Sequence, residues 1–250
     1  MTNYNYGSFP LPITPSEKAT LAQLNIHEEA MPHYQDSLFH LRLGKYINSC
    51  KLTGDFVECG VYNGQSAASI TAGIKGDTNN THFKVYLYDS WEGFPEASMD
   101  KDGPMARSLQ GKMDASLPGV KQKMEKLLAG QVVYRKGWFQ DTFKEEIPEK
   151  IALLHIDCDF YQSVLDTFNR FYDNVVERGL IVIDDFGAFS GCREAFYEFC
   201  AQRKIRPLVR SYDHTRVFWN KTSDTESNIE HTTVMPYNWQ AYIKCLRENP

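Results

Sequence analysis

Two nearly continuous apolar runs that end in aspartates, IALLHIDCDF at residues 151–160 and GLIVIDDFG at residues 179–187, decide the fold of this chain. Strands with both faces buried show this pattern, because helices cover both sides of a parallel sheet. Runs this short, bounded by Gly or by charge, favour strands over helices. They therefore predict two neighbouring strands at residues 151–156 and 180–183.

Strand and helix patterns alternate on both sides of these runs. Apolar segments predict further strands at 55–60, 83–88 and 131–134, and a hairpin within 207–219 that turns near Asp213 and His214. Helical spacing and capping residues predict helices near 16–24 and at 36–50, 64–75, 118–129, 161–178, 191–204 and 237–247. The alternation indicates an α/β, Rossmann-like fold: a seven-stranded, mostly parallel sheet with helices on both faces and one antiparallel strand.

Two segments stand outside this alternation. Residues 1–35 are rich in turn residues and read as an irregular arm, followed by the helix at 36–50 with Asp36 or Ser37 as its cap. We assign residues 1–50 to an N-terminal arm and helix that cover the substrate or contact another copy, and 51–250 to the main domain. Residues 90–117 read as a long loop with one short helix, and loops of this length are usually functional.

Carboxylates gather at the predicted carboxyl ends of the strands, where open parallel sheets bind their ligands. Asp157 and Asp159 follow one strand and face the same way in extended chain, while Asp184 and Asp185 end the neighbouring strand. Crowded like charges are unfavourable without a positive partner. Hard cations such as Mg²⁺ prefer carboxylate oxygens, so Asp157, Asp184 and Asp185 are predicted to bind Mg²⁺ or another divalent cation.

A glycine-containing turn and a following acid indicate a second ligand. Residues 57–67, VECGVYNGQSA, place Gly60 and Gly64 around a strand-to-helix turn, where glycine permits close approach of a ligand. The dinucleotide fingerprint GxGxxG is absent. Asp89 ends the next strand and is predicted to accept hydrogen bonds from ribose hydroxyls. Trp138 and Phe139 follow another strand and could flank an adenine ring or belong to the core.

The composition of the chain limits the classes of molecule that it can be expected to bind. The chain of 250 residues carries a formal net charge of −5 and shows no cluster of Lys and Arg, which argues against nucleic acid because phosphate contacts need such clusters. No signal pattern opens the chain, and no apolar run approaches the roughly 20 residues of a membrane helix. We expect a cytoplasmic protein with a small-molecule partner, no membrane contact and reduced cysteines.

Taken together, the motifs resemble the macrocin-type (TylF-like) O-methyltransferases, within the class I methyltransferase fold. The matching stretches are FVECGVYNGQSA, LYDSWEGFPE, KGWFQDTF, LLHIDCDFYQS and GLIVIDDFG, in family order over residues 56–187. The resemblance implies S-adenosylmethionine as methyl donor and a hydroxyl of a sugar or another part of a secondary metabolite as acceptor. A glycosylated antibiotic-type acceptor fits this family. Independently of the resemblance, the aromatic-rich arm and the helix at 36–50 either support a homodimer or higher homo-oligomer or pack on the core.

The resemblance also implies residue roles. Glu58, Gly60 and Gly64 would line the methionine end of the cofactor, Asp89 and Ser90 would hold the ribose, and Gly137 to Phe139 would border the adenine. Asp159 is similar to the family's general base. The full predicted cofactor set is Glu58, Gly60, Tyr62, Asn63, Gly64, Ser66, Asp89, Ser90, Gly137, Trp138, Phe139 and Asp157; the predicted catalytic residues are Asp159 and Asp157.

Three alternatives remain at this stage. A catechol-type O-methyltransferase would share the fold and the metal, but that family has Lys where this chain has Phe160, three residues after Asp157. A metal-dependent glycosyltransferase would explain DCD as a DxD motif but would leave the glycine turn and Asp184–Asp185 without a role. A non-catalytic methyltransferase-like binding protein would not need its aspartates intact.

Overall fold

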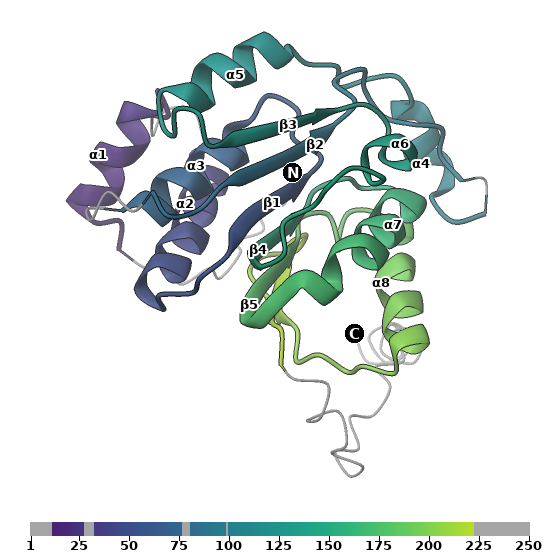
Figure 1. The fold of residues 1–250 in the computed structure, drawn as a ribbon. Coiled ribbons are helices and arrows are strands. Elements are labelled where there is room, and N and C mark those ends of the chain that lie inside the picture. Colours follow the sequence, from purple (N-terminus) through teal and green to yellow (C-terminus); the bar gives the residue numbers. More distant parts are fainter. Residues whose placement is uncertain (1–11, 28–32, 77–80, 99, 223–250) are drawn as a thin grey trace, which may run out of the picture.

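A seven-stranded sheet forms the centre of the molecule (Figure 1). The computed structural model describes residues 12–27, 33–76, 81–98 and 100–222. The strands lie in the order β3-β2-β1-β4-β5-β7-β6. Their bounds are β1 (Asp55–Cys59), β2 (Val85–Asp89), β3 (Val132–Lys136), β4 (Ile151–Ile156), β5 (Val175–Ile183), β6 (Arg210–Ser211) and β7 (Val217–Asn220). β7 runs antiparallel to both of its neighbours and the other pairings are parallel, so the predicted topology is confirmed.

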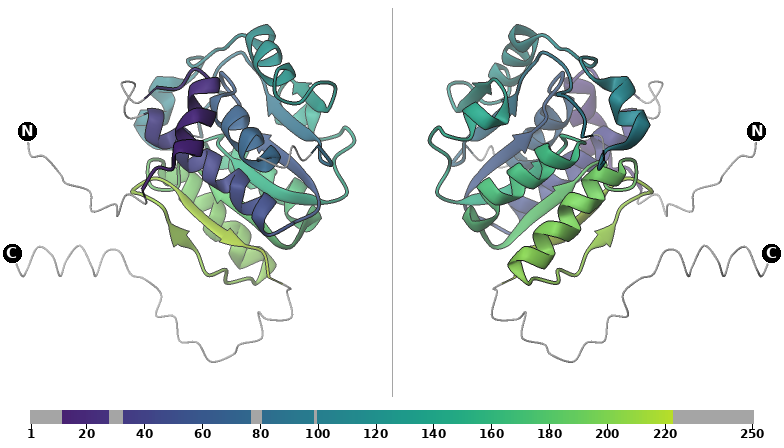
Figure 2. Two further views of the ribbon diagram at one scale, coloured as in Figure 1. Left: turned by 90° about the vertical axis from the view of Figure 1, so that its left-hand side faces the viewer. Right: turned by 90° about the vertical axis from the view of Figure 1, so that its right-hand side faces the viewer.

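Helices cover both faces of the sheet, as Figure 2 shows from two sides. One face carries α2 (His33–Ser49), α3 (Gln65–Lys75) and α5 (Leu117–Glu125), whose apolar side chains share a core with the sheet. α1 (Pro15–Gln23) packs outside α2. The other face carries α7 (Tyr161–Phe171) and α8 (Ser190–Arg203). α4 (Gly103–Leu109) and α6 (Phe139–Thr142) lie near the carboxyl ends of the strands.

The apolar spacing explains why α7 docks on the sheet. Val164, Leu165, Phe168 and Phe171 recur at helical intervals and are all buried, forming the stripe that a helix buries against a sheet. Fully burying a side chain of this size contributes about 1.5–3 kcal/mol. The same docking sets the start of α7, and hence the turn at its N-terminus, against the carboxyl end of β4.

The predicted helix at 161–178 was wrong in its second half. α7 ends at Phe171, a short 3₁₀ turn covers Tyr172–Asn174, and β5 already begins at Val175. β5 pairs with the first residue of β4 through Val175 and resumes at Leu180, with the register shifted in between. The partner strand therefore recruits the β-branched Val175 and Val176 into the sheet, a long-range preference that helical periodicity does not report.

Other element boundaries differ in smaller ways. α2 begins at His33, so Asp36 lies within its first turn and is not its cap. The short helix predicted within 90–117 is α4, whereas α6 was not predicted. The predicted helix at 237–247 lies outside the described residues. Among the helices that the structure describes, none has the length and apolarity needed to cross a membrane.

Candidate active site

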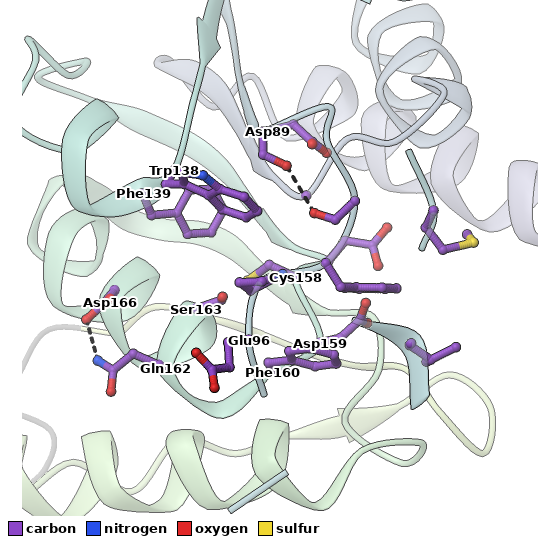
Figure 3. A pocket seen from close by; sticks show the side chains of 18 of the residues that line it. Asp89, Glu96, Trp138, Phe139, Cys158, Asp159, Phe160, Gln162, Ser163 and Asp166 are labelled. Carbon is purple, nitrogen blue, oxygen red and sulfur yellow. Dashed lines mark hydrogen bonds between the residues drawn. The ribbon is translucent and has the colours of Figure 1, made fainter. Parts of the chain in front are cut away.

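A cavity of about 730 Å³ opens at the carboxyl ends of β1, β2 and β4. β1 and β4 are neighbours in the sheet although β2 and β3 lie to the other side of β1, so the cavity sits where the strand order reverses, the usual ligand position in such folds. Figure 3 shows Trp138 and Phe139 on one side, Asp159 and Phe160 on the other, and Cys158 between them. A volume of this size suits a small-molecule ligand.

The turn after β1 has no room for a side chain at Gly60. Gly60 stands at φ +85°, and a Cβ there would lie 1.9 Å from the carbonyl oxygen of Asp157. No larger residue fits, because β1 and β4 already pair through the N–H of Asp157 and the carbonyl of Cys59 at 2.9 Å. The predicted glycine requirement thus has a steric cause within the protein itself.

Asp89 holds this turn in place. Its Oδ2 accepts hydrogen bonds from the N–H groups of Val61 at 2.6 Å and Tyr62 at 2.8 Å, and its Oδ1 accepts one from the N–H of Trp91 at 2.6 Å. Asp89 also lines the cavity. The three N–H groups take three of the roughly four lone-pair sites of a carboxylate, so one site remains for a ligand.

Four aspartates converge at the ends of β4 and β5, as the sequence predicted. The N–H of Asp184 donates to the carbonyl of Ile156 at 2.9 Å, which sets the two strand ends side by side. One side-chain oxygen of each of Asp157, Asp184 and Asp185 lies within 4.8 Å of the others. Asp157, Asp159 and Asp185 also line the cavity. Three carboxylates at this spacing fit a hard divalent cation, which takes oxygen ligands and keeps several waters.

The environment of these acids differs from one to the next. Burial, followed by the charge of Asp184, raises the pKa of Asp157 well above its ordinary value. Burial and a hydrogen bond with Asp185 do the same to the pKa of Asp159. Burial alone would also raise the pKa of Asp184, but the neighbouring His155, a hydrogen bond with His40 and the charge of Arg216 hold it well below the usual range. Removing positive charge from this cluster therefore costs free energy.

Asp159 adopts an unusual backbone conformation. Its φ is +56°, and the N–H of Phe160 donates across it to the carbonyl of Cys158 at 2.6 Å. Non-glycine residues rarely occupy this region, and such strain concentrates at functional sites. The turn explains why Asp159, two residues after Asp157, lies on the cavity wall although the strand has already ended.

Not every predicted cofactor residue reaches the cavity. Gly60, Tyr62, Asp89, Ser90, Gly137, Trp138, Phe139 and Asp157 line it, whereas Glu58, Asn63, Gly64 and Ser66 do not. Glu58 is fully buried, where it accepts hydrogen bonds from Ser66 Oγ at 2.5 Å and pairs with His155 Nδ1 at 2.8 Å. Glu58 and Ser66 thus lie beneath the glycine turn, and their cofactor roles stay predictions.

The loop after β2 closes over the cavity through a residue that sequence reasoning missed. Asp102 is buried; its Oδ1 accepts a hydrogen bond from the N–H of Tyr161 at 2.6 Å, at the start of α7, and its Oδ2 accepts one from the N–H of Ser98 at 2.7 Å. A Cβ at Gly191, in α8, would lie 2.1 Å from Asp102 Oδ1. Phe94 of the same loop stacks on Phe160 with ring centroids 4.9 Å apart. The loop is therefore fastened to both helices.

Replacing Asp102 with alanine should loosen this loop. The buried N–H of Tyr161 would lose its acceptor, at a cost of about 1–3 kcal/mol, and the partly buried N–H of Ser98 would lose its acceptor too. The melting temperature should fall by about 2–4 °C per kcal/mol. Circular dichroism melting measures the loss, and hydrogen exchange over residues 94–112 locates it. Asp100→Ala, exposed in the same loop, is the control. Equal melting of both variants would contradict the anchoring role.

Comparison with known proteins decides the family. Residues 37–221 match the family model described as macrocin-O-methyltransferase (TylF). The chain belongs to the macrocin O-methyltransferase (TylF) family. It is therefore an S-adenosylmethionine-dependent O-methyltransferase, and the resemblance expected from the sequence is confirmed.

Two relatives have names that state the position of methyl transfer. The 8-demethyl-8-(2,3-dimethoxy-alpha-L-rhamnosyl)-tetracenomycin-C 4'-O-methyltransferase of Streptomyces olivaceus is 30% identical over 190 residues, covering 72% of this chain and 71% of the relative. The mycinamicin III 3''-O-methyltransferase of Micromonospora griseorubida is 29% identical, covering 68% of this chain and 69% of the relative. The glycosyltransferase and non-catalytic alternatives are thereby set aside.

Solved structures confirm the class I methyltransferase fold. The O-methyltransferase NovP superposes with a TM-score of 0.67 at 25% identity, covering 76% of this chain and 80% of NovP. CalS11, a calicheamicin methyltransferase, gives a TM-score of 0.60 at 17% identity, covering 83% and 93%. Both show the shared fold, and the first is named as an O-methyltransferase.

Proposed function

We propose that this TylF-family enzyme transfers the methyl group of S-adenosylmethionine to a hydroxyl of a glycosylated secondary metabolite. We also propose that Asp157, Asp184 and Asp185 hold a divalent cation, with Mg²⁺ as the first candidate. The observation that carries the proposal is the cavity itself. Its wall joins an aromatic side at Trp138 and Phe139 to a carboxylate side at Asp157, Asp159 and Asp185. The relatives from S. olivaceus and M. griseorubida bear names of glycoside methyltransferases.

The binding part of the proposal follows from the lining residues. Trp138 and Phe139 offer flat apolar surfaces for an adenine ring, and Asp89 offers one free acceptor position to a ribose hydroxyl. Gly60 lies on the cavity wall, so the methionine part can approach the backbone of this turn. Phe94, in the loop after β2, and Phe160 stack with ring centroids 4.9 Å apart. Their rings exclude water from the acceptor side of the cavity, and electrostatic interactions act more strongly where water is excluded.

The chemical part assigns the proton to Asp159. The acceptor oxygen bonds to the methyl carbon as the carbon–sulfur bond breaks, the sulfonium becomes a thioether, and the hydroxyl proton passes to the Asp159 carboxylate. When bound, the divalent cation supplies positive charge beside the acceptor oxygen. Asp157, Asp159 and Asp185 line the same side of the cavity. An acceptor hydroxyl bound on that side is therefore oriented beside Asp159, which removes its proton. Orienting the reactants in this way lowers the barrier substantially.

A panel of acceptors tests the proposal. The full chain is incubated with methyl-deuterated S-adenosylmethionine, Mg²⁺ and either neutral glycosides with free sugar hydroxyls or simple catechols, and products are read by mass spectrometry. We expect label on sugar oxygens. Labelling of catechols alone would move the acceptor to phenols, as in the alternative kept from the sequence. No labelling of either class, while S-adenosylhomocysteine binds, would refute the proposed acceptor.

The remaining expectations accompany this proposal. The acceptor is a small molecule, with neither nucleic acid nor membrane as partner. The five cysteines in the described ranges are free thiols, which fits the reducing cytoplasm that we propose as compartment. A homo-oligomer, and the division into an arm at 1–50 and a main domain at 51–250, stay predictions; α2 shares its core with the sheet.

A further inference from the structure

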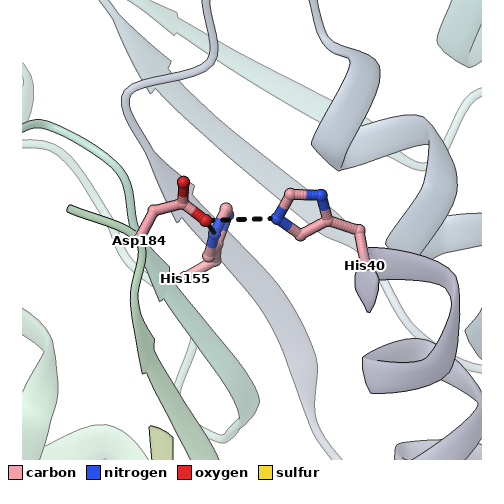
Figure 4. A group of neighbouring side chains, drawn as sticks. All are labelled: His40, His155 and Asp184. Atoms are coloured by element: carbon pink, nitrogen blue, oxygen red, sulfur yellow. Dashed lines mark hydrogen bonds and ion pairs between the residues drawn. The ribbon is translucent and has the colours of Figure 1, made fainter. Parts of the chain in front are cut away.

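One oxygen of Asp184 is surrounded by nitrogen atoms from three different elements. Its Oδ1 lies 2.8 Å from Arg216 Nε in the β6–β7 hairpin, 3.4 Å from His40 Nε2 in α2 and 3.5 Å from His155 Nε2 in β4. Figure 4 shows the second oxygen of Asp184 turned away from both imidazole rings. The carboxylate is thus oriented from one side only, and its second oxygen remains available.

Arg216 is itself held in place. Its Nη1 lies 2.7 Å from Asp213 Oδ2 and 3.0 Å from Asp36 Oδ1. Asp213 is in turn fixed by the N–H groups of Thr215 and Arg216, both at 2.8 Å from its Oδ1. Only 13% of the Arg216 side chain is exposed. Because its contacts run to α2, to its own hairpin and to β5, the guanidinium has one well-defined position.

The charges in this cluster do not cancel. Arg216 brings one positive charge to three carboxylates, those of Asp36, Asp184 and Asp213. His155 is buried between Asp184 and Glu58, with Nδ1 at 2.8 Å from the latter. One side-chain oxygen of each of Asp157 and Asp185 lies within 4.8 Å of an oxygen of Asp184, and Arg216 forms no ion pair with either of them among the described contacts. The arrangement therefore orients Asp184 without neutralising the acidic cluster.

We propose that Arg216 and His40 are positioning residues for the cation site: they fix Asp184 through Oδ1 so that Oδ2 is directed toward a divalent cation shared with Asp157 and Asp185. The inference rests on the proposed function, because it assumes that the acidic cluster binds a cation. Groups that orient metal ligands in this way usually change metal affinity by about 10–100-fold when removed. The hairpin and α2 thereby become parts of the active site without lining the cavity.

Cation binding by the full chain tests the proposal. Mn²⁺ is titrated by calorimetry into wild type and Arg216→Gln, each saturated with S-adenosylhomocysteine. We expect the variant to bind Mn²⁺ about 10–100-fold more weakly, with unchanged affinity for S-adenosylhomocysteine. Arg216→Lys should restore part of the affinity, because lysine keeps the charge but not the fork of donors. Arg210→Gln, exposed on β6 of the same hairpin, should leave the Mn²⁺ affinity unchanged.

A second variant guards against misfolding. His40→Asn, in a different element, should weaken Mn²⁺ binding in the same direction if Arg216→Gln does not fold. If wild type binds Mn²⁺ and folded variants at both positions bind it within about twofold of wild type, well under the expected change, the positioning role is overturned while the proposed cation site stands. If wild type binds no divalent cation, both the proposed cation site and this positioning role are refuted.

Discussion

Asp159→Asn is expected to lower kcat for methyl transfer by about 10²–10⁴-fold, the contribution of a positioned general base. The amide has the shape of the carboxylate but cannot accept the proton of the acceptor hydroxyl. Asparagine also tolerates the left-handed backbone that Asp159 adopts at φ +56°, so the turn between Cys158 and Phe160 should survive. Steady-state kinetics with the glycoside that accepts the labelled methyl group measures the loss.

The rate of Asp159→Asn is compared with that of a control variant in which an aspartate outside the cavity is replaced. Asp173→Asn makes the same chemical change at an exposed surface pair with Arg203, where ion pairs contribute little, and should keep the wild-type rate. Affinity for S-adenosylhomocysteine should be the same in wild type and Asp159→Asn, because Gly60, Asp89 and Trp138 are untouched. A near-normal rate in Asp159→Asn would show that another group removes the proton.

Removal of divalent cations is expected to suppress turnover by at least about 10²-fold, since a cation at a reacting oxygen contributes several kcal/mol and each 1.36 kcal/mol or so is tenfold in rate. The protein is treated with EDTA, desalted and assayed, and Mg²⁺ is then restored. Cofactor binding should persist, because the glycine turn, Asp89 and the aromatic side of the cavity contain none of the proposed ligands. Calorimetry with S-adenosylhomocysteine checks this point.

Asp185→Asn tests the cation site by mutation instead of by EDTA treatment. Unlike Asp184, Asp185 has no ion pair with Arg216, so its replacement removes a proposed cation ligand while leaving the Arg216 network intact. We expect a higher Mg²⁺ concentration for half-maximal rate and a lower maximum. Full activity of wild type in EDTA, with no metal retained by elemental analysis, would instead remove the cation from the mechanism.

Most of the fold could be predicted from local patterns. β4 begins and ends where the sequence placed it, at Ile151 and Ile156, because a continuous apolar run flanked by charge has few other solutions. The boundary of α7 could not be predicted, because Val175 joins β5 only when Ile151 is present beside it. Helical spacing reports the residues of one segment, whereas strand pairing depends on another.

The sequence alone determined that Asp157, Asp159, Asp184 and Asp185 lie close together. Acids that follow neighbouring buried parallel strands lie at the same edge of the sheet, whatever side chains surround them. Only the tertiary structure decided which partners these acids have. Arg216 and His40 reach Asp184 across 32 and 144 residues of chain, and Asp102 reaches Tyr161 across 59. Such pairings depend on how helices and loops pack on the sheet, and a single polar contact between distant segments leaves no periodic signal in the sequence.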